Sequence, residues 1–343
     1  MMKQKITRVL VEITLRKTLA EIKQDPERSI RKLVDLALDF AKGRFQQQFF
    51  QTAAQLLTSE DSAYYLLAEK LVSTVDSERL IAFGMNVGYN GCTQGAETIR
   101  SIEAREHFNI PWCLSVFLDP EAFPANQETY RRLIHQGQEL GIYTWQFHTQ
   151  SIFPELLELF AAFPDSAFVL FCPPLCITEE LLIRVQALPN LMFACTYEET
   201  SYAECNESCR RLRESGFLYG LHVPYEAGDE QRLILGSFLE PLMALSPAFT
   251  FFSPKAPLSP EERHGFYLAI QRLRLEQRYP TVFMELLQDN QAIDGIISSQ
   301  GCSGGFTASG ELYSLSDRDT TSDTNLFRQD LKTILKKAFP KAE

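Results

Sequence analysis

The stretch from Gly84 to Gly95, GMNVGYNGCTQG, marks the place where the pattern of the chain changes. It holds four of the 17 glycines in the 343-residue chain, which is a local concentration. The apolar run LIAFGMNV, which we interpret as a first β-strand, leads into it, and the helical pattern GAETIRSIEAREHF follows. We therefore expect the first strand-to-helix turn here, where glycine lets the backbone approach a ligand or take a positive φ.

Beyond this stretch, β-rich runs alternate with helical patterns. Seven further strands are predicted at PWCLSVFLD, IYTWQFHT, AFVLFCP, LMFACTY, LYGLHVP, FTFFSP and TVFMELL. Eight strands separated by seven helices are typical of a (β/α) barrel. Apolar strands that barely alternate also indicate burial on both faces of the sheet. The sequence therefore predicts an α/β fold with a TIM-like barrel, complete or partial, over residues 80–300.

The regions on either side of the predicted barrel have different patterns. Residues 1–79 keep a helical period, as in SIRKLVDLAL, and we expect a small helical cap or bundle there. In residues 301–343, the run GGFTASGELYSLSD is typical of a β-hairpin that turns at Ser309 and Gly310. A polar linker and a final helix, LFRQDLKTILKKAF, follow it. Three regions are therefore predicted.

Charge and composition exclude several classes of partner. Residues 1–79 hold 13 Lys and Arg against 11 Asp and Glu, a net charge of +2. Because the whole chain has a net charge of −11, residues 80–343 have a net charge of −13. An acidic main body argues against nucleic acid as a partner. No apolar run reaches the roughly 18 residues of a membrane span. Glu12 and Arg16 interrupt the apolar start, which favours an amphipathic helix over a signal peptide and predicts a cytoplasmic protein.

The cysteines do not indicate a disulfide framework. Eight cysteines are few for a chain of this length, and several lie inside apolar runs, where a thiol packs like a small apolar group. The pair Cys172 and Cys176 flanks a stiff Pro-Pro-Leu segment, so this loop could present two thiols together.

Candidate ligand-binding residues follow from the barrel geometry, because ligands bind at the carboxyl ends of parallel strands. The interpretation of the first loop as a binding loop places several ligand contacts in it, and two more follow later strands. The predicted ligand-binding residues are Asn86, Tyr89, Asn90, Gly91, Cys92, Asp119 and Lys255.

Candidate catalytic residues lie at three other strand ends. His148, Glu198 and His222 follow or end predicted strands, and their side chains suit acid–base chemistry. A site of histidines and carboxylates could also hold a metal ion, but neither H-x-H nor HExxH spacing occurs. We therefore predict these three residues as catalytic and assign no metal and no cofactor.

The tail carries a family resemblance. The segment GCSGGFTASGELYSLSD matches the pattern C-x-x-G-x…-G-x-x-Y-x-C at Cys302, Gly304 or Gly305, Gly310 and Tyr313. With the barrel before it, the chain resembles the radical SAM superfamily, closest to members with a SPASM-type extension. The resemblance implies an incomplete barrel of βα units with its site at the barrel mouth, over the first strand.

The chain lacks the residues that bind the iron–sulfur cluster in this family. The family motif C-x-x-x-C-x-x-C is absent, and NVGYNGCTQGAETIR keeps only Cys92, whereas a [4Fe–4S] cluster needs three or four thiolates. VFLDPEAF stands where the family has a Gly-Gly-Glu motif for the SAM amino group, and Ser314 replaces the final tail cysteine. The resemblance therefore implies the scaffold without the radical chemistry, that is, a degenerate active site.

Several functions fit these patterns. The leading hypothesis is a radical-SAM-like barrel protein that lacks the cluster motif and binds a small molecule, nucleotide or peptide at the barrel mouth. One alternative is an active radical SAM-type or other metal-dependent enzyme with cysteine or His/Glu ligands from several strand ends. A hydrolase or isomerase that uses His148, His222 and Glu198 is another. The last is a non-catalytic interaction protein whose N-terminal helices bind a protein partner.

Overall fold

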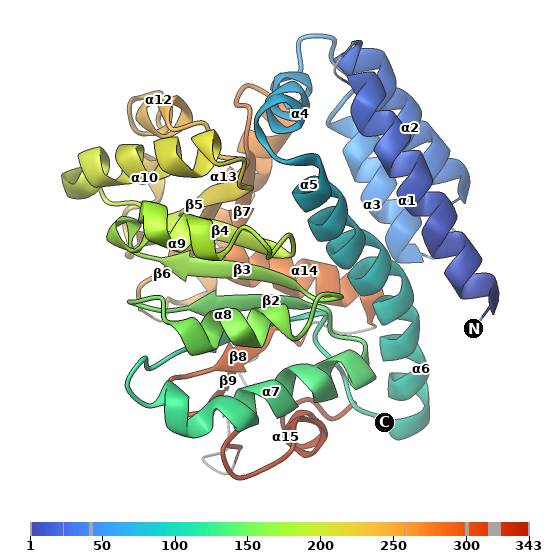
Figure 1. The fold of residues 1–343 in the computed structure, drawn as a ribbon, viewed down its shortest axis with the longest axis vertical. Coiled ribbons are helices and arrows are strands. Elements are labelled where there is room, and N and C mark those ends of the chain that lie inside the picture. Colours follow the sequence, from blue (N-terminus) through green and yellow to red (C-terminus); the bar gives the residue numbers. More distant parts are fainter. Residues whose placement is uncertain are drawn as a thin grey trace. The chain divides into compact units, whose positions relative to one another are not determined.

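The described part of the chain forms two compact units (Figure 1). The computed structural model describes residues 2–22, 24–40, 44–256, 258–298, 302–314 and 324–341. Unit 1 comprises the residues up to 81, residues 177–183 and residues 193–288, and unit 2 comprises residues 82–176, residues 184–192 and those from 289 onwards. The predicted boundary at residues 300 and 301 and most of the predicted polar linker lie outside the described residues, and the boundary after residue 79 stays a prediction.

Unit 1 contains the first helices of the chain and a four-stranded parallel sheet. Its helices are α1 (Met2–Ile22), α2 (Pro26–Phe40), α3 (Arg44–Gln55), α4 (Ala63–Thr74), most of α5 (Ser77–Gly84) and of α9 (Glu179–Arg184), η3 (Glu199–Ser201), α10 (Tyr202–Glu214), α11 (Glu230–Leu233), α12 (Gly236–Ala244) and α13 (Pro260–Glu276). Its strands, in the order β7-β6-β5-β4, are β4 (Leu191–Thr196), β5 (Tyr219–Tyr225), β6 (Phe249–Pro254) and β7 (Val282–Glu285).

Unit 2 contains a five-stranded sheet in the order β3-β2-β1-β8-β9. The strands are β1 (Cys113–Phe117), β2 (Thr144–His148), β3 (Ala167–Cys172), β8 (Gly304–Phe306) and β9 (Leu312–Ser314), of which only β9 is antiparallel to its neighbour. The helical segments are η1 (Met85–Gly95), α6 (Ala96–Glu106), α7 (Phe123–Leu140), α8 (Pro154–Ala161), η2 (Pro174–Cys176), most of α14 (Leu286–Ile297) and α15 (Leu331–Ala338).

The topology within each unit confirms the prediction of a mostly parallel α/β fold. Strands β1, β2 and β3 lie side by side in chain order with a helix between successive strands, and β4 to β7 do the same. This succession is that of a (β/α) barrel, since each crossover helix returns the chain to the next parallel position. Among the described residues, β7 and β9 each have one strand neighbour, which corresponds to a partial barrel.

The predicted first strand is wrong, because LIAFGMNV is helical. Residues 77–106 form one uninterrupted helical segment of α5, the π-helix η1 and α6. The Asp76 carboxylate caps its start by accepting hydrogen bonds from the backbone N–H groups of Glu78 and Arg79. A short apolar run fits a strand or a buried helix equally, and periodicity alone does not separate them. Asp76, followed by Glu78 in the first turn, was the helix-start signal.

Two glycines of η1, Gly91 and Gly95, serve close packing. This π-helix extends over 11 residues, whereas most π-helical segments are single turns. At its last residue, Gly95, an added Cβ would lie 2.3 Å from the carbonyl oxygen of Gly141, in the turn before β2. Gly141 itself has a φ of 98°, which glycine adopts without strain. The glycine-rich stretch is therefore a point of backbone contact rather than a turn after a strand.

Helices α7 and α8 cover one face of β1 to β3 (Figure 1). Trp145 and Phe147 of β2 are fully buried on this face, and the Phe147 ring lies 5.2 Å from that of Phe160 in α8. Because successive side chains of a strand alternate between faces, the other residues of β2 point to the opposite face. That opposite face carries the aromatic residues described below.

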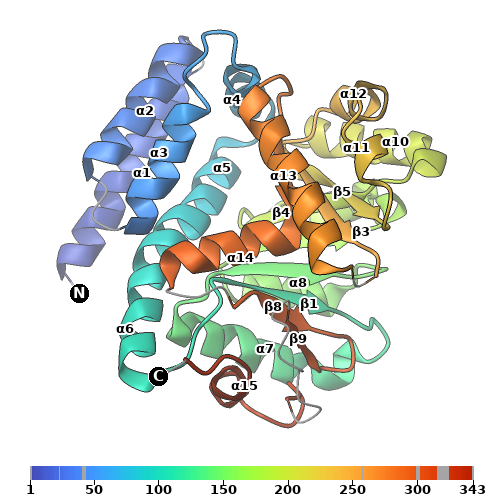
Figure 2. The same cartoon turned by 180° about the vertical axis from the view of Figure 1, so that it is seen from behind.

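The tail contributes two strands to unit 2 (Figure 2). Strand β8 pairs in parallel with β1, with Gly305 opposite Ser115, and continues into the antiparallel β9. The turn between them contains Gly310, with a φ of 81°, at the position where the sequence predicts a hairpin turn. The sheet position beside β1 is thus filled from the tail and not from residues 80–87.

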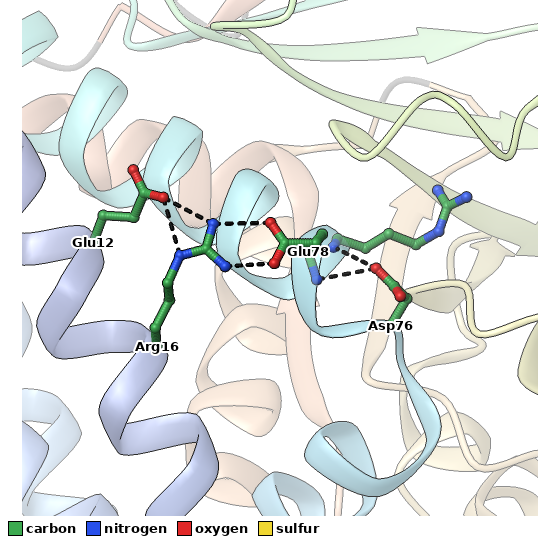
Figure 3. Close-up of polar contacts among 5 residues, drawn as sticks. Glu12, Arg16, Asp76 and Glu78 are labelled. Atoms are coloured by element: carbon green, nitrogen blue, oxygen red, sulfur yellow. Dashed lines mark hydrogen bonds and ion pairs between the residues drawn. The ribbon is translucent and has the colours of Figure 1, made fainter.

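Arg16 links α1 to the start of α5 within unit 1 (Figure 3). Its guanidinium pairs with Glu78 through both terminal nitrogens, one of them at 2.8 Å, and with Glu12 at 2.8 Å. The Arg16 hydrogen bond holds the pKa of Glu78 below its ordinary value.

Elsewhere on α1, four apolar side chains are exposed: Val9, Leu10, Val11 and Ile13. Over the described residues, no helix combines the length and apolar character needed to cross a bilayer.

Candidate functional site

Asn86 and Asn90 attach η1 to the loop that precedes β3. Asn86 Nδ2 donates hydrogen bonds to the carbonyl oxygens of Pro164 at 2.8 Å and Ser166 at 3.0 Å. Asn90 Nδ2 donates to Asn86 Oδ1 at 2.9 Å and to the carbonyl oxygen of Asp165 at 2.8 Å. Both side chains are buried. They lie at the amino end of β3, so the prediction that they follow the carboxyl end of a strand is wrong.

The other residues of the predicted first loop share this position. An added Cβ on Gly91 would lie 3.3 Å from Oγ1 of Thr144, the first residue of β2. Tyr89 is buried. Burial raises the pKa of the Cys92 thiol to about 12, which disfavours the reactive thiolate. Within unit 2, these residues are therefore at the strand ends opposite to His148, and their role in ligand binding stays a prediction.

Asp119, Glu198 and Lys255 are exposed at carboxyl ends of strands, as predicted. Asp119 Oδ1 accepts a hydrogen bond from the backbone N–H of Glu121 at 2.9 Å, which orders the chain before α7. Glu198 follows β4, and Lys255 Nζ lies 3.8 Å from Glu226 Oε1 after β6. Each side chain thus reaches solvent from a loop, and any function for it stays a prediction.

His148 is the centre of a row of stacked rings at the carboxyl ends of three strands of unit 2. Its ring centroid lies 4.4 Å from that of Phe117 on β1 and 4.3 Å from that of Phe171 on β3, with interplanar angles of 13° and 12°. The strand register places the three residues opposite one another. We call them the aromatic row. Phe117 is 40% exposed, His148 is half-buried and Phe171 is buried, so solvent reaches the row at Phe117 and His148.

Polar side chains lie beside the aromatic row, nearer the amino ends of the same strands. Ser115 Oγ donates a hydrogen bond to Gln146 Oε1 at 2.8 Å, and Asn290 Nδ2 of α14 donates to the same oxygen at 3.3 Å. All three side chains are buried. The Asn290 Oδ1 atom has no hydrogen-bond partner among the described residues. A buried acceptor of this kind favours a ligand that brings an N–H or O–H donor.

Tyr313 of the tail extends the aromatic row. Its ring lies edge-on to Phe117, with centroids 5.8 Å apart, and a side-chain hydrogen bond joins its hydroxyl to Ser115. Burial raises the pKa of Tyr313, so it remains a neutral phenol. The tyrosine of the tail motif therefore belongs to the same site as His148.

His222 is buried in β5 of unit 1, between two hydroxyl side chains. Its Nε2 lies 2.7 Å from Ser253 Oγ on β6, and its Nδ1 lies 3.4 Å from Thr196 Oγ1 on β4. Burial lowers its pKa to about 4, which keeps the imidazole neutral and makes it a weak base. Glu198 follows the same strand as Thr196.

We expect the buried imidazole of His222 to make stability depend on pH. The unfolded chain takes up a proton near pH 6.5, whereas the folded protein stays neutral down to about pH 4. Stability is therefore lost as the pH falls from 6.5 towards 4, by about 2 kcal/mol at pH 5. Urea unfolding of the wild type and His222→Gln at pH 7.5 and pH 5 measures the difference between the two slopes. Parallel profiles would show that the folded protein protonates His222 as readily as the unfolded chain.

The described cysteines do not fit a [4Fe–4S] cluster. The loop after β1, LDPEA, has no cysteine, and Cys92 lies at the amino ends of the strands of unit 2, away from Cys172 and Cys176 at the carboxyl end of β3. Cys92 is instead near Cys113, at the start of β1. No group of three or more His, Cys, Asp or Glu side chains in the described ranges has an arrangement that could hold a metal ion.

A hollow in unit 1 is lined by none of the predicted site residues. It has a volume of about 340 Å³ and is lined by α4 and by residues before β6 and β7, among them Lys70, Ala248 and Pro280. Tyr219, at the start of β5, closes one side. These are the amino ends of the strands, where conserved catalytic groups of barrel folds are not found.

The sequence patterns predicted His148 as a site residue but not the two phenylalanines that complete the aromatic row. Of the predicted residues, unit 2 brings Asp119 close to His148, since the Leu118 N–H donates to the His148 carbonyl oxygen at 2.8 Å. Phe117 and Phe171 were read only as strand residues. Their signal was positional, because both stand at the carboxyl end of a predicted strand, as His148 does.

Comparison with known proteins identifies structural neighbours at low identity. No family model and no curated protein matches the chain. Among solved structures, SuiB of Streptococcus suis bound to S-adenosylmethionine matches with a TM-score of 0.48 and 8% identity, over 72% of this chain and 69% of that one. The structure of SuiB bound to its precursor peptide SuiA matches with a TM-score of 0.48 and 9% identity, over 72% of this chain and 70% of that one.

Proposed function

We propose that the chain is a barrel-type binding protein that takes a peptide or small molecule with an aromatic group at the carboxyl ends of β1, β2 and β3. The aromatic row carries this proposal. Three rings from three strands stack at the end of a parallel sheet where ligands of such folds bind, and two of them, Phe117 and His148, reach solvent. Stacked aromatic side chains contribute about 0.5–1.5 kcal/mol per pair beyond the area they bury, so a further ring is a favourable occupant.

The polar side chains beside the aromatic row support a ligand with a hydrogen-bond donor. Asn290 Oδ1 is a buried acceptor, and the His148 imidazole supplies the polar atoms of the row. A peptide satisfies both requirements, because it joins an apolar side chain to a backbone N–H. The alternative of a nucleotide is less favoured, since the described loops that directly follow β1, β2 and β3 contain no Lys or Arg.

The same scaffold is proposed to act without an iron–sulfur cluster. The support is chemical, since the loop directly after β1, LDPEA, contains no cysteine and burial holds the thiol of Cys92 protonated. The proposed binding protein therefore needs no redox chemistry of its own at the aromatic row. The predicted protein partner of the N-terminal helices stays a prediction.

Binding of a defined peptide tests the proposal. The probe is an acetylated and amidated Gly-Gly-Trp-Gly-Gly, with Gly-Gly-Ala-Gly-Gly as its partner, measured by calorimetry against the full chain. We expect the tryptophan peptide to bind at least about tenfold more tightly than the alanine peptide, and Phe117→Ala and His148→Ala to remove most of that preference.

Leu275→Ala is the matched control for these variants. Leu275 is 60% exposed on α13 of unit 1, so this change removes an exposed apolar side chain that belongs to neither the aromatic row nor unit 2. It is expected to leave the preference unchanged. Equal binding of both peptides by the wild type, or an unchanged preference in Phe117→Ala, would contradict the proposed function.

A further inference from the structure

Cys172 and Cys176 form a pair of contacting thiols at the carboxyl end of β3. Cys172 is the last residue of the strand and is fully buried. The chain then turns through η2, where the Cys176 N–H donates to the Pro173 carbonyl oxygen at 3.1 Å. This turn returns Cys176 to Cys172, and a side-chain hydrogen bond joins the two sulfurs. The two prolines between them limit the conformations of the turn.

The two thiols have different surroundings. Cys176 is half-buried, and its thiol donates a hydrogen bond to the carbonyl oxygen of Gln150, with the sulfur and the oxygen 3.4 Å apart. Hydrogen bonds from the Cys172 thiol and from the Ile152 N–H stabilise a negative charge on the Cys176 sulfur and lower its pKa. The same contact and burial raise the pKa of Cys172 well above its ordinary value. Because Cys176 is partly exposed and Cys172 is buried, a substrate disulfide reaches Cys176 first, which makes Cys176 the nucleophile of the pair.

The other cysteines lack this combination. Cys195, Cys205 and Cys209 contact one another in unit 1, but all three are buried, and the pKa values of Cys205 and Cys209 are raised. Cys92 is half-buried, but burial raises its pKa to about 12. Reactive cysteines are partly exposed and have a stabilised thiolate, and structural ones are buried and inert. The Cys172 and Cys176 pair meets the description of a reactive pair.

We propose that Cys176 and Cys172 form a thiol–disulfide exchange centre that acts on small-molecule or peptide disulfides. In the first step, the Cys176 thiolate attacks one sulfur of the substrate disulfide, its S–S bond breaks, and a thiolate leaves. In the second step, Cys172 loses its proton and attacks the Cys176 sulfur, which releases the second substrate thiolate. One substrate disulfide becomes two thiols, and the protein dithiol becomes a disulfide, so atoms and electrons balance.

The position of the pair suits a substrate of this kind. Leu175, between the two prolines and Cys176, is 77% exposed and offers an apolar contact beside the nucleophile. Phe171 of the aromatic row directly precedes Cys172 in β3. The exchange centre needs neither the aromatic row nor a bound peptide, so it does not depend on the function proposed above.

Reaction of the full chain with glutathione disulfide tests the proposal, with acid quenching and peptide mass spectrometry. In the wild type we expect a disulfide between Cys172 and Cys176 and two equivalents of released glutathione. In Cys172→Ser we expect a lasting glutathione adduct on Cys176, because no thiol remains to displace it. In Cys176→Ser we expect no adduct on Cys172. Cys92→Ser is the matched control and is expected to react as the wild type does.

The measurement has outcomes that overturn the proposal. A lasting adduct on Cys176 of the wild type would show that Cys172 does not displace the bound glutathione. Formation of adducts in Cys176→Ser at the wild-type rate would show that Cys176 is not the nucleophile. Competition with iodoacetamide on the wild type gives a second readout that needs no variant. We expect Cys176 to be alkylated at least about tenfold faster than Cys92, and equal rates would contradict the proposal. Circular dichroism checks that each variant is folded.

Discussion

Replacing Gly95 by alanine is expected to lower the free energy of unfolding by about 3 kcal/mol or more. The added Cβ would lie 2.3 Å from the carbonyl oxygen of Gly141 and 2.8 Å from that of Asn90. Both are backbone atoms, so relief requires a shift of η1 or of the turn before β2. Overpacking of this kind typically costs about 1–3 kcal/mol, and more where the backbone must move. Urea denaturation followed by circular dichroism measures the loss.

Gly88→Ala is the matched control in the same π-helix. An added Cβ on Gly88 would meet no atom within 4 Å. Alanine there reduces the conformational freedom of the unfolded chain, so we expect stability to be unchanged or to rise by up to about 1 kcal/mol. If both variants lost stability equally, the cause would be a general intolerance of side chains in η1 rather than contact between Gly95 and Gly141.

Replacing Asp294 by alanine is expected to cost about 3 kcal/mol or more, because two buried backbone donors would lose their acceptor. The Trp112 N–H donates to Asp294 Oδ1 at 2.8 Å, and the Cys302 N–H also donates to this carboxyl group. Asp294 is fully buried. Each buried donor left without a partner costs about 1–3 kcal/mol. The measurement is the free energy of unfolding at neutral pH.

Asp294→Asn separates the hydrogen bonds from the charge. Burial and the nearby Glu103 carboxylate raise the pKa of Asp294 well above its ordinary value, which favours the neutral carboxyl group in the folded protein. Asparagine keeps the accepting oxygen without a charge, and we expect a loss below about 1 kcal/mol. Because the folded pKa is raised, the contribution of the wild-type residue is full below pH 3.8 and falls as the pH rises. A loss in Asp294→Asn as large as in Asp294→Ala would contradict a neutral carboxyl group.

The strands were predictable because they are short, apolar and bounded by turn residues. Seven of the eight predicted runs overlap β1 to β7, one strand each, since burial on both faces demands apolar residues at every position. The failure at LIAFGMNV has the opposite cause. A buried helix and a buried strand need the same residues, and only the cap at Asp76 distinguished them.

The candidate site was predictable only in part. His148 and Asp119 stand at carboxyl ends of parallel strands, and this position follows from the order of strands and helices alone. Asn86, Asn90 and Gly91 were assigned to the same end because the segment before them was read as a strand. Once that segment is a helix, their side chains meet the loop before β3 and the first residue of β2.

The sequence alone determined the alternation of strands and helices, the parallel pairing, and the strand ends at which His148 and Cys172 lie. These features follow from local patterns of apolar residues and turn residues. The tertiary structure alone decided that Phe117 and Phe171 stack on His148, that Cys176 turns back to Cys172, and that β8 from the tail lies beside β1. These contacts join residues whose partners are set by strand register and chain crossing, and neither leaves a periodic signal in the sequence.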